Sequence, residues 1–200
     1  PAWARESQYP YVDQNSTVGA AILQDMTLTD DFYADFTPQL EKGLPHPLLI
    51  PDYALGRLVE TPAEMVVVID AALENDGVIN LSTAAVGGWT FVKDAAEQEC
   101  KLLQQSGVAV DCALVGGSWN PETLRQHLFT PRPNLTTLST HATHFTYMAS
   151  NFELFSTDWL STVPDLKNTL VYVLGCQAGV NIPGTSARNY QDFPQTFLSR

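Results

Sequence analysis

Cys176 is the residue of this chain whose surroundings best suit nucleophilic chemistry. It follows the continuous apolar run 169–174 and lies between Gly175 and Gly179. A cysteine placed directly after a strand, among small residues, can be reached by a substrate backbone, and its own N–H can point at a developing oxyanion. The ordinary alternative is a buried structural cysteine, which most free cysteines are.

Two histidines, His141 and His144, follow another strand-like segment, 135–140. A thiol nucleophile needs a base to form the thiolate and an acid to protonate the leaving amine, and histidine does both near neutral pH. For each histidine taken alone, a structural role at the surface or in the core is favoured. However, the carboxyl ends of neighbouring parallel strands meet at one edge of a sheet, where such folds bind ligands. We therefore expect His141 and Cys176 to face each other on neighbouring strands.

Helices and strands alternate in the part of the chain that must position these residues. A capping box at Thr61-Pro62-Ala63-Glu64 opens one helix, and Gly107 closes another. We expect strands at 53–57, 78–86, 108–115, 135–140 and 168–174, and helices at 61–73, 94–105, 120–129 and 158–162. This alternation predicts an α/β fold with a mainly parallel sheet. Residues 1–50 are expected to form a loop-rich N-terminal segment of the same domain, and 51–200 its core.

The charge of the chain and the motifs that it lacks argue against several classes of function. The formal net charge is −12, from 10 Lys and Arg against 22 Asp and Glu, which argues against nucleic acid and against an anionic membrane surface as partners. The cysteines and histidines lack the spacings of zinc sites. No phosphate-binding loop or nucleophile-elbow motif occurs. The three cysteines, Cys100, Cys112 and Cys176, allow one disulfide with one free thiol, or three thiols.

The acidic-aromatic segment 29–35 leaves one question of cofactors open. Its carboxylates fit a solvated turn or a cation-binding loop. We expect that the protein requires no cofactor. The alternative is a structural calcium ion, which no specific motif in the sequence supports.

The ordered set of these segments resembles the gingipain family of cysteine peptidases, within the caspase-like clan of caspases, gingipains, clostripains and separases. The similarity covers roughly residues 20–200. It is carried by His141 after one strand and Cys176 after the next, and by the segments 30–35, 51–57, 61–70, 87–94 and 170–179.

The resemblance implies a three-layer α/β/α caspase-like domain that hydrolyses peptide bonds in peptide or protein substrates through a thioester on Cys176. His141, flanked by the small residues Thr140 and Ala142, is the first choice for its partner, and His144 the second. The N–H groups of Cys176 and Ala142 would form the oxyanion hole. Asp94 is placed where gingipains bind a basic side chain before the cut, although it could instead cap the helix that begins there.

The family's histidine is flanked by glycines, which this chain lacks. A catalytically inactive domain of the same fold, used for binding or as a scaffold, is therefore the alternative, and a small-molecule-binding α/β domain is a third. The family fold has further strands after the nucleophile, so a second chain from the same precursor is an expected partner. Cleavage after Arg200 would fit self-processing by an enzyme that cuts after arginine. The family also favours a secreted or cell-surface location.

Overall fold

The computed structural model describes residues 15, 20, 31–39, 50–58, 61–160, 162–163, 165–176, 178–179, 181 and 191–199. The chain divides into two compact units, Pro1–Leu58 and Val59–Arg200. The candidate site lies in the second unit.

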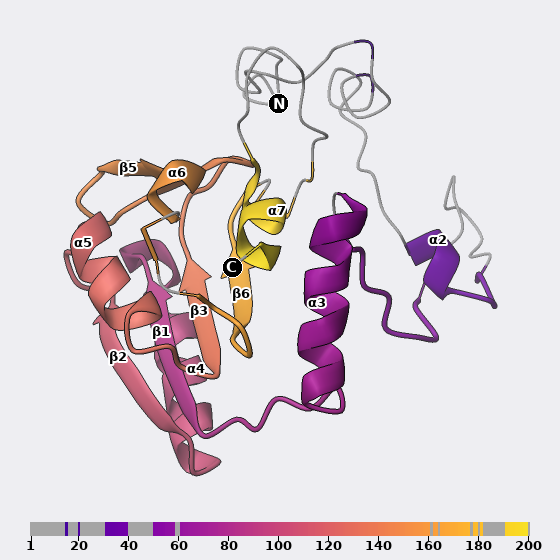
Figure 1. The fold of residues 1–200 in the computed structure, drawn as a ribbon. Coiled ribbons are helices and arrows are strands. Elements are labelled where there is room, and N and C mark those ends of the chain that lie inside the picture. The colour runs from indigo at the N-terminus through magenta and orange to yellow at the C-terminus, as the bar shows by residue number, and fades with distance from the viewer. Residues whose placement is uncertain are drawn as a thin grey trace. The chain divides into compact units, whose positions relative to one another are not determined.

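The second unit is built on a four-stranded parallel sheet of order β2-β1-β3-β6 (Figure 1). Its strands are β1 Thr83–Gly88, β2 Ala109–Val115, β3 Leu135–Ser139 and β6 Leu170–Leu174. All three pairings are parallel, so the four carboxyl ends lie at one edge of the sheet. The α/β fold with a parallel sheet predicted from the sequence is confirmed.

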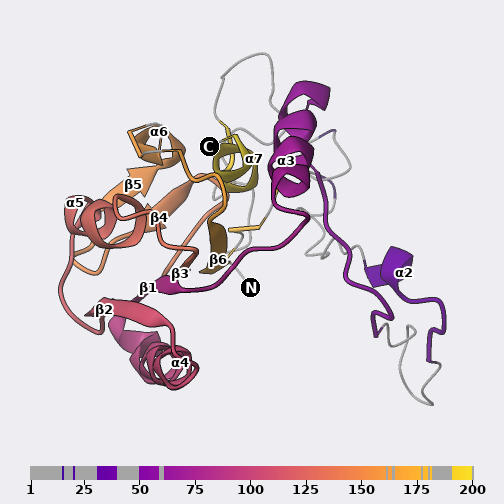
Figure 2. The same cartoon turned by 60° about the horizontal axis from the view of Figure 1, so that its bottom comes forward.

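Helices cover both faces of this sheet (Figure 2). Helix α4, Lys93–Gln105, packs on one face against Val86 and Val110. Three helices lie on the other face: α5 Pro121–Leu124 with its π-helical continuation Arg125–Phe129, α6 Thr157–Leu160, and α7 Phe193–Leu198. Their side chains form the main core with Ala85, Leu114 and Leu138 of the sheet. This three-layer arrangement is the one that the resemblance implies.

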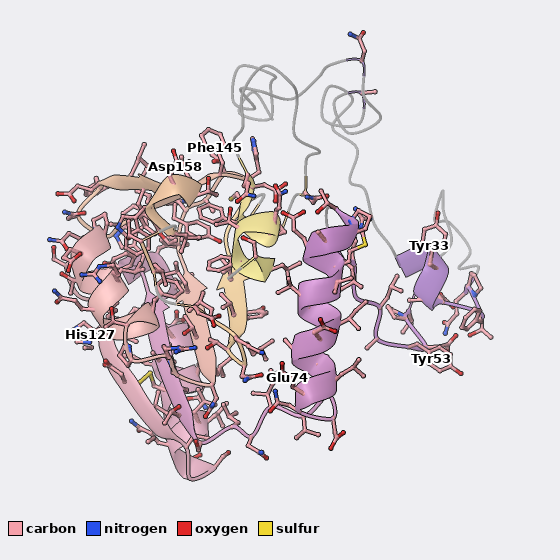
Figure 3. All side chains as sticks on the ribbon, viewed as in Figure 1. Tyr33, Tyr53, Glu74, His127, Phe145 and Asp158 are labelled. Carbon is pink, nitrogen blue, oxygen red and sulfur yellow. A yellow bond between two sulfur atoms is a disulfide. The ribbon has the colours of Figure 1, made fainter. Side chains whose placement is uncertain are left out.

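Helix α3, Pro62–Glu74, begins as its sequence predicts. The Thr61 hydroxyl accepts the N–H of Glu64, and the Glu64 carboxylate accepts the N–H of Thr61. At the other end Glu74, labelled in Figure 3, pairs with Lys167, with Oε2 and Nζ 2.5 Å apart. The Gln195 amide of α7 also donates to Glu64. These polar contacts join α3 to α7 and to the segment before β6. No residue of α3 is buried.

Two expectations about elements need correction, and one hairpin was not predicted. The strand predicted at 78–86 instead occupies Thr83–Gly88, and Val78, Ile79 and Leu81 are exposed. It runs through Gly88 because Gly87 and Gly88 pair with β2 and β3. A Cβ on Gly88 would lie 2.6 Å from the Cβ of Ala96, so glycine lets α4 pack closely. Residues 53–57 form no strand. The hairpin of β4 Thr146–Met148 and β5 Leu154–Ser156 was not predicted.

In the first unit the acidic-aromatic segment forms the short helix α2, Asp31–Ala34. The carboxylate of the buried Asp35 accepts the N–H groups of Thr37 and Ile50, at 2.7 and 2.8 Å, and so holds loop backbone. The described residues contain no cluster of three metal-ligating side chains. Among them, no helix is long and apolar enough to cross a membrane.

A disulfide joins Cys100 of α4 to Cys112 of β2, and Cys176 is the free cysteine. The sequence left open whether the three cysteines form one disulfide or remain three free thiols. Because the bridge closes a loop across a sequence separation of 12 residues, replacing both cysteines with alanine is expected to lower the free energy of unfolding by about 3 kcal/mol. Urea denaturation of the two proteins measures the difference. Alkylation of the denatured, unreduced protein should modify Cys176 alone, and modification of all three cysteines would contradict the pairing.

Candidate functional site

The site is at the carboxyl edge of the sheet, where β3 and β6 end side by side. Ser139 pairs in register with Leu174, and the N–H of Thr140 donates to the carbonyl of Leu174 at 3.0 Å. His141 follows the last residues of β3, and Cys176 follows those of β6. The parallel register therefore brings the two residues singled out by the sequence to one edge, on neighbouring strands.

Gly175 makes this close approach possible. A Cβ on Gly175 would lie 2.7 Å from the Cβ of Ala142 and 2.8 Å from the carbonyl oxygen of Thr140. Neither atom is at the end of a flexible side chain, so neither can move away without shifting backbone. Gly175 thus lets the segment after β3 lie directly against the segment after β6.

The Gly175→Ala substitution is expected to lower the free energy of unfolding by about 1–3 kcal/mol, because the added methyl must push the two strand ends apart. Gly117→Ala is the matched control at the end of β2. Its Cβ would meet the carbonyl of Ala113 at 3.9 Å, an ordinary contact. Urea denaturation of both variants gives the comparison, and equal stabilities would show that the strand ends are not tightly apposed.

Cys176 presents an exposed free thiol in the turn after β6. Two backbone N–H groups near it have no hydrogen-bond acceptor among the described residues: its own and that of Ala142. Ala142 forms a single antiparallel bridge with Tyr147, whose hydrogen bonds run from Thr143 to Thr146 and from Met148 to His141. The N–H of Ala142 takes no part in them. Among the described residues, nothing therefore competes with an oxygen bound at this edge for these two amides.

His141 is exposed, and its ring contacts two aromatic side chains. Phe91 stacks on it with ring centroids 4.7 Å apart and planes inclined by 23°. Trp89 meets it edge-on, also at 4.7 Å. Both aromatic residues come from the connection between β1 and α4, at the same edge of the sheet. Sequence reasoning missed them, although the Trp-Thr-Phe run directly after a strand end was the signal that could have found them.

His144 lies in a different environment from His141. It is buried, with 5% of its surface exposed, and its backbone carbonyl accepts the N–H of Phe193 at 2.9 Å. Burial lowers the pKa of His144 to about 4, because desolvation disfavours the imidazolium ion. This histidine is accordingly neutral near pH 7 and part of the packed interior.

The buried His144 predicts a loss of stability in mild acid. Between about pH 6.5 and 4 the unfolded chain binds a proton at this site that the folded chain does not, so the free energy of unfolding falls as the pH falls. The contribution is about 3 kcal/mol over the whole window. Urea denaturation at several pH values measures it, with His144→Gln as the comparison because it removes the titrating group. Identical pH profiles for the two proteins would contradict the prediction.

Asp94 lies in the first turn of α4 and is exposed. A carboxylate there is favoured by the helix macrodipole, which is the structural alternative to a substrate contact. It makes no ion pair with a described residue, whereas its neighbour Lys93 lies over Gly116 at the end of β2 and pairs with Glu97 at 3.4 Å. Asp94 thus begins the helix that directly follows the connection carrying Trp89 and Phe91. Arg200 lies outside the described residues.

Comparison with known protein families and with curated proteins found no match for this chain.

Proposed function

We propose that this chain carries the catalytic site of a cysteine peptidase with a Cys176–His141 dyad. One observation carries the proposal: the register of β3 and β6 places an exposed free thiol and an exposed imidazole on neighbouring strands at the carboxyl edge of a parallel sheet. The disulfide supports it, because pairing of Cys100 with Cys112 leaves Cys176 as the available nucleophile.

The proposed reaction needs only groups found at this edge. His141 takes the thiol proton, and the Cys176 thiolate attacks the carbonyl carbon of the scissile peptide bond. The N–H groups of Cys176 and Ala142 stabilise the negative oxygen of the tetrahedral intermediate. The carbon–nitrogen bond then breaks, and the imidazolium donates its proton to the leaving amine. Water, deprotonated by His141, hydrolyses the resulting thioester and restores the thiol.

His141 suits this role better than His144. A general base for Cys176 must exchange its proton at the surface where substrate binds, and the ring of His141 is exposed at the strand end next to that of Cys176. The buried His144 would need to become charged within the core during each turnover, which its low pKa disfavours.

Specificity for a basic side chain before the cut is the finer part of the proposal. Asp94 is exposed in the first turn of α4, which starts at the edge of the sheet where substrate would lie, and a carboxylate pairs well with arginine. Reporter peptides with Arg or Leu before the scissile bond, compared on the wild type and on Asp94→Asn, measure this preference. An unchanged preference in the variant would remove Asp94 from substrate recognition.

The peptidase proposal is tested by digestion of an unfolded protein substrate, with new termini identified by mass spectrometry. Pretreatment with iodoacetamide, which should alkylate Cys176, is expected to stop the cleavage. Cleavage that continues after complete alkylation, or an unmodified Cys176 under conditions that alkylate a free thiol, would contradict the mechanism.

A binding role is the second candidate, and the exposed edge strand β6 favours it. Leu170, Tyr172 and Leu174 are each more than half exposed, and in the described part of the second unit β6 pairs on one side only. A strand from a second chain of the same precursor could add to this edge, as in other strand-addition complexes. Alkylation of Cys176 without any peptide hydrolysis, together with copurification of such a chain, would favour this reading.

A further inference from the structure

The imidazole of His141 contacts two aromatic rings. In peptidase dyads and triads the base is commonly oriented by a third group, often a carboxylate or amide. Within the described part of the chain, no hydrogen bond or ion pair joins the His141 ring to another side chain. Its neighbours are Phe91, stacked at 4.7 Å, and Trp89, edge-on at 4.7 Å with an interplanar angle of 89°.

Backbone contacts fix where these two rings lie. The N–H of Trp89 donates to the carbonyl of Ser139 at 3.0 Å, which ties Trp89 to the end of β3 two residues before His141. The next turn, Thr90–Val92, is a 3₁₀ helix closed by a bond from the N–H of Val92 to the carbonyl of Trp89 at 2.9 Å. This turn carries Phe91 onto the imidazole. The two rings are therefore anchored to the same strand end as the histidine.

We infer that Phe91, supported by Trp89, is a positioning residue for His141. The inference rests on the proposed peptidase function. A ring stacked on one face of the imidazole and another meeting it edge-on restrict rotation of the His141 side chain about its bonds. Aromatic pairs of this kind favour offset-stacked and edge-to-face geometries, so they also specify an orientation. The aromatic pair thereby fills the place of the third group.

Kinetics separate positioning from substrate binding. Phe91→Leu removes the stacked ring and is expected to lower kcat roughly three- to tenfold with KM unchanged, because the imidazole spends less time oriented toward the thiol. Phe91→Tyr keeps a ring at this position and should retain nearly the wild-type kcat. Phe152→Leu is the matched control: Phe152 is exposed and contacts Trp89 at 5.3 Å in the same cluster, and no ring contact joins it to His141.

A raised KM with unchanged kcat in Phe91→Leu would overturn the inference, since Phe91 would then contact substrate. Equal kcat values for Phe91→Leu and the wild type would also overturn it. Thermal unfolding of each variant checks that the fold is retained, which is expected because Phe91 is 58% exposed.

A second measurement does not depend on turnover. In NMR spectra of protein labelled at histidine, the ring protons of His141 should carry a ring-current shift from Phe91. The shift should be lost in Phe91→Leu and kept in Phe91→Tyr, and the signal is assigned from its absence in His141→Ala. Unchanged His141 signals in Phe91→Leu would overturn the positioning role. Failure of the wild type to hydrolyse any peptide would instead contradict the proposed peptidase function. The NMR result would still test whether Phe91 positions the His141 ring.

Discussion

The Cys176→Ala variant is expected to lose peptide hydrolysis by at least about 10⁴-fold while its thermal unfolding midpoint stays nearly unchanged. The activity is lost because no other group in the proposed mechanism can form the thioester, and loss of one member of a catalytic unit removes most of the effect of the whole unit. Stability is retained because the side chain is exposed, and surface substitutions usually change the free energy of unfolding by within about 0.5 kcal/mol.

The cysteine pair that forms the disulfide supplies the control for this experiment. The double variant Cys100→Ala, Cys112→Ala loses stability but keeps Cys176, so at a temperature where it is folded it should retain activity. Hydrolysis and calorimetry on both variants separate loss of the nucleophile from loss of the fold. Full activity in Cys176→Ala would refute the mechanism.

The His141→Ala variant is expected to lower kcat by about 10³–10⁴-fold, since the thiolate then forms without a base and the leaving amine departs without an acid. His144→Gln at pH 7 is the matched comparison, from a histidine three residues away. It should keep most of the wild-type activity, because His144 is buried and neutral at that pH.

Added imidazole gives this second experiment a sharper readout. Free imidazole that enters the space left by His141→Ala should restore part of the lost rate, and it should have no effect on Cys176→Ala. If His144→Gln were the inactive variant and His141→Ala the active one, the peptidase class would stand and the assignment of the base would be wrong.

Together these variants bear on how the edge of the sheet is organised. Cys176 comes from β6, His141 from β3, and the rings that contact His141 from the connection after β1. Three neighbouring strand ends would thus contribute to one site. Gly175 lets two of these ends, those of β3 and β6, approach closely.

The sequence by itself determined the elements whose signals are local. The capping box at Thr61 and Glu64 placed the start of α3, and the apolar run ending at Leu174 placed β6. The positions of His141 and Cys176 just after strands followed from the same reading. These features depend on residues a few positions apart, so hydrophobic periodicity and capping chemistry are enough to predict them.

Only the tertiary structure decided features that depend on contacts between distant segments. His141 and His144 look alike in the sequence, yet His141 is exposed and contacts Trp89 and Phe91, while His144 is buried and its carbonyl accepts the N–H of Phe193. The start of β1 was misplaced for a similar reason: apolar residues 78–81 read as a strand, but pairing with β2 and β3 begins only at Thr83 and Ala84. Burial and strand pairing are set by which segments meet in space, and a pattern read along one segment does not contain that information.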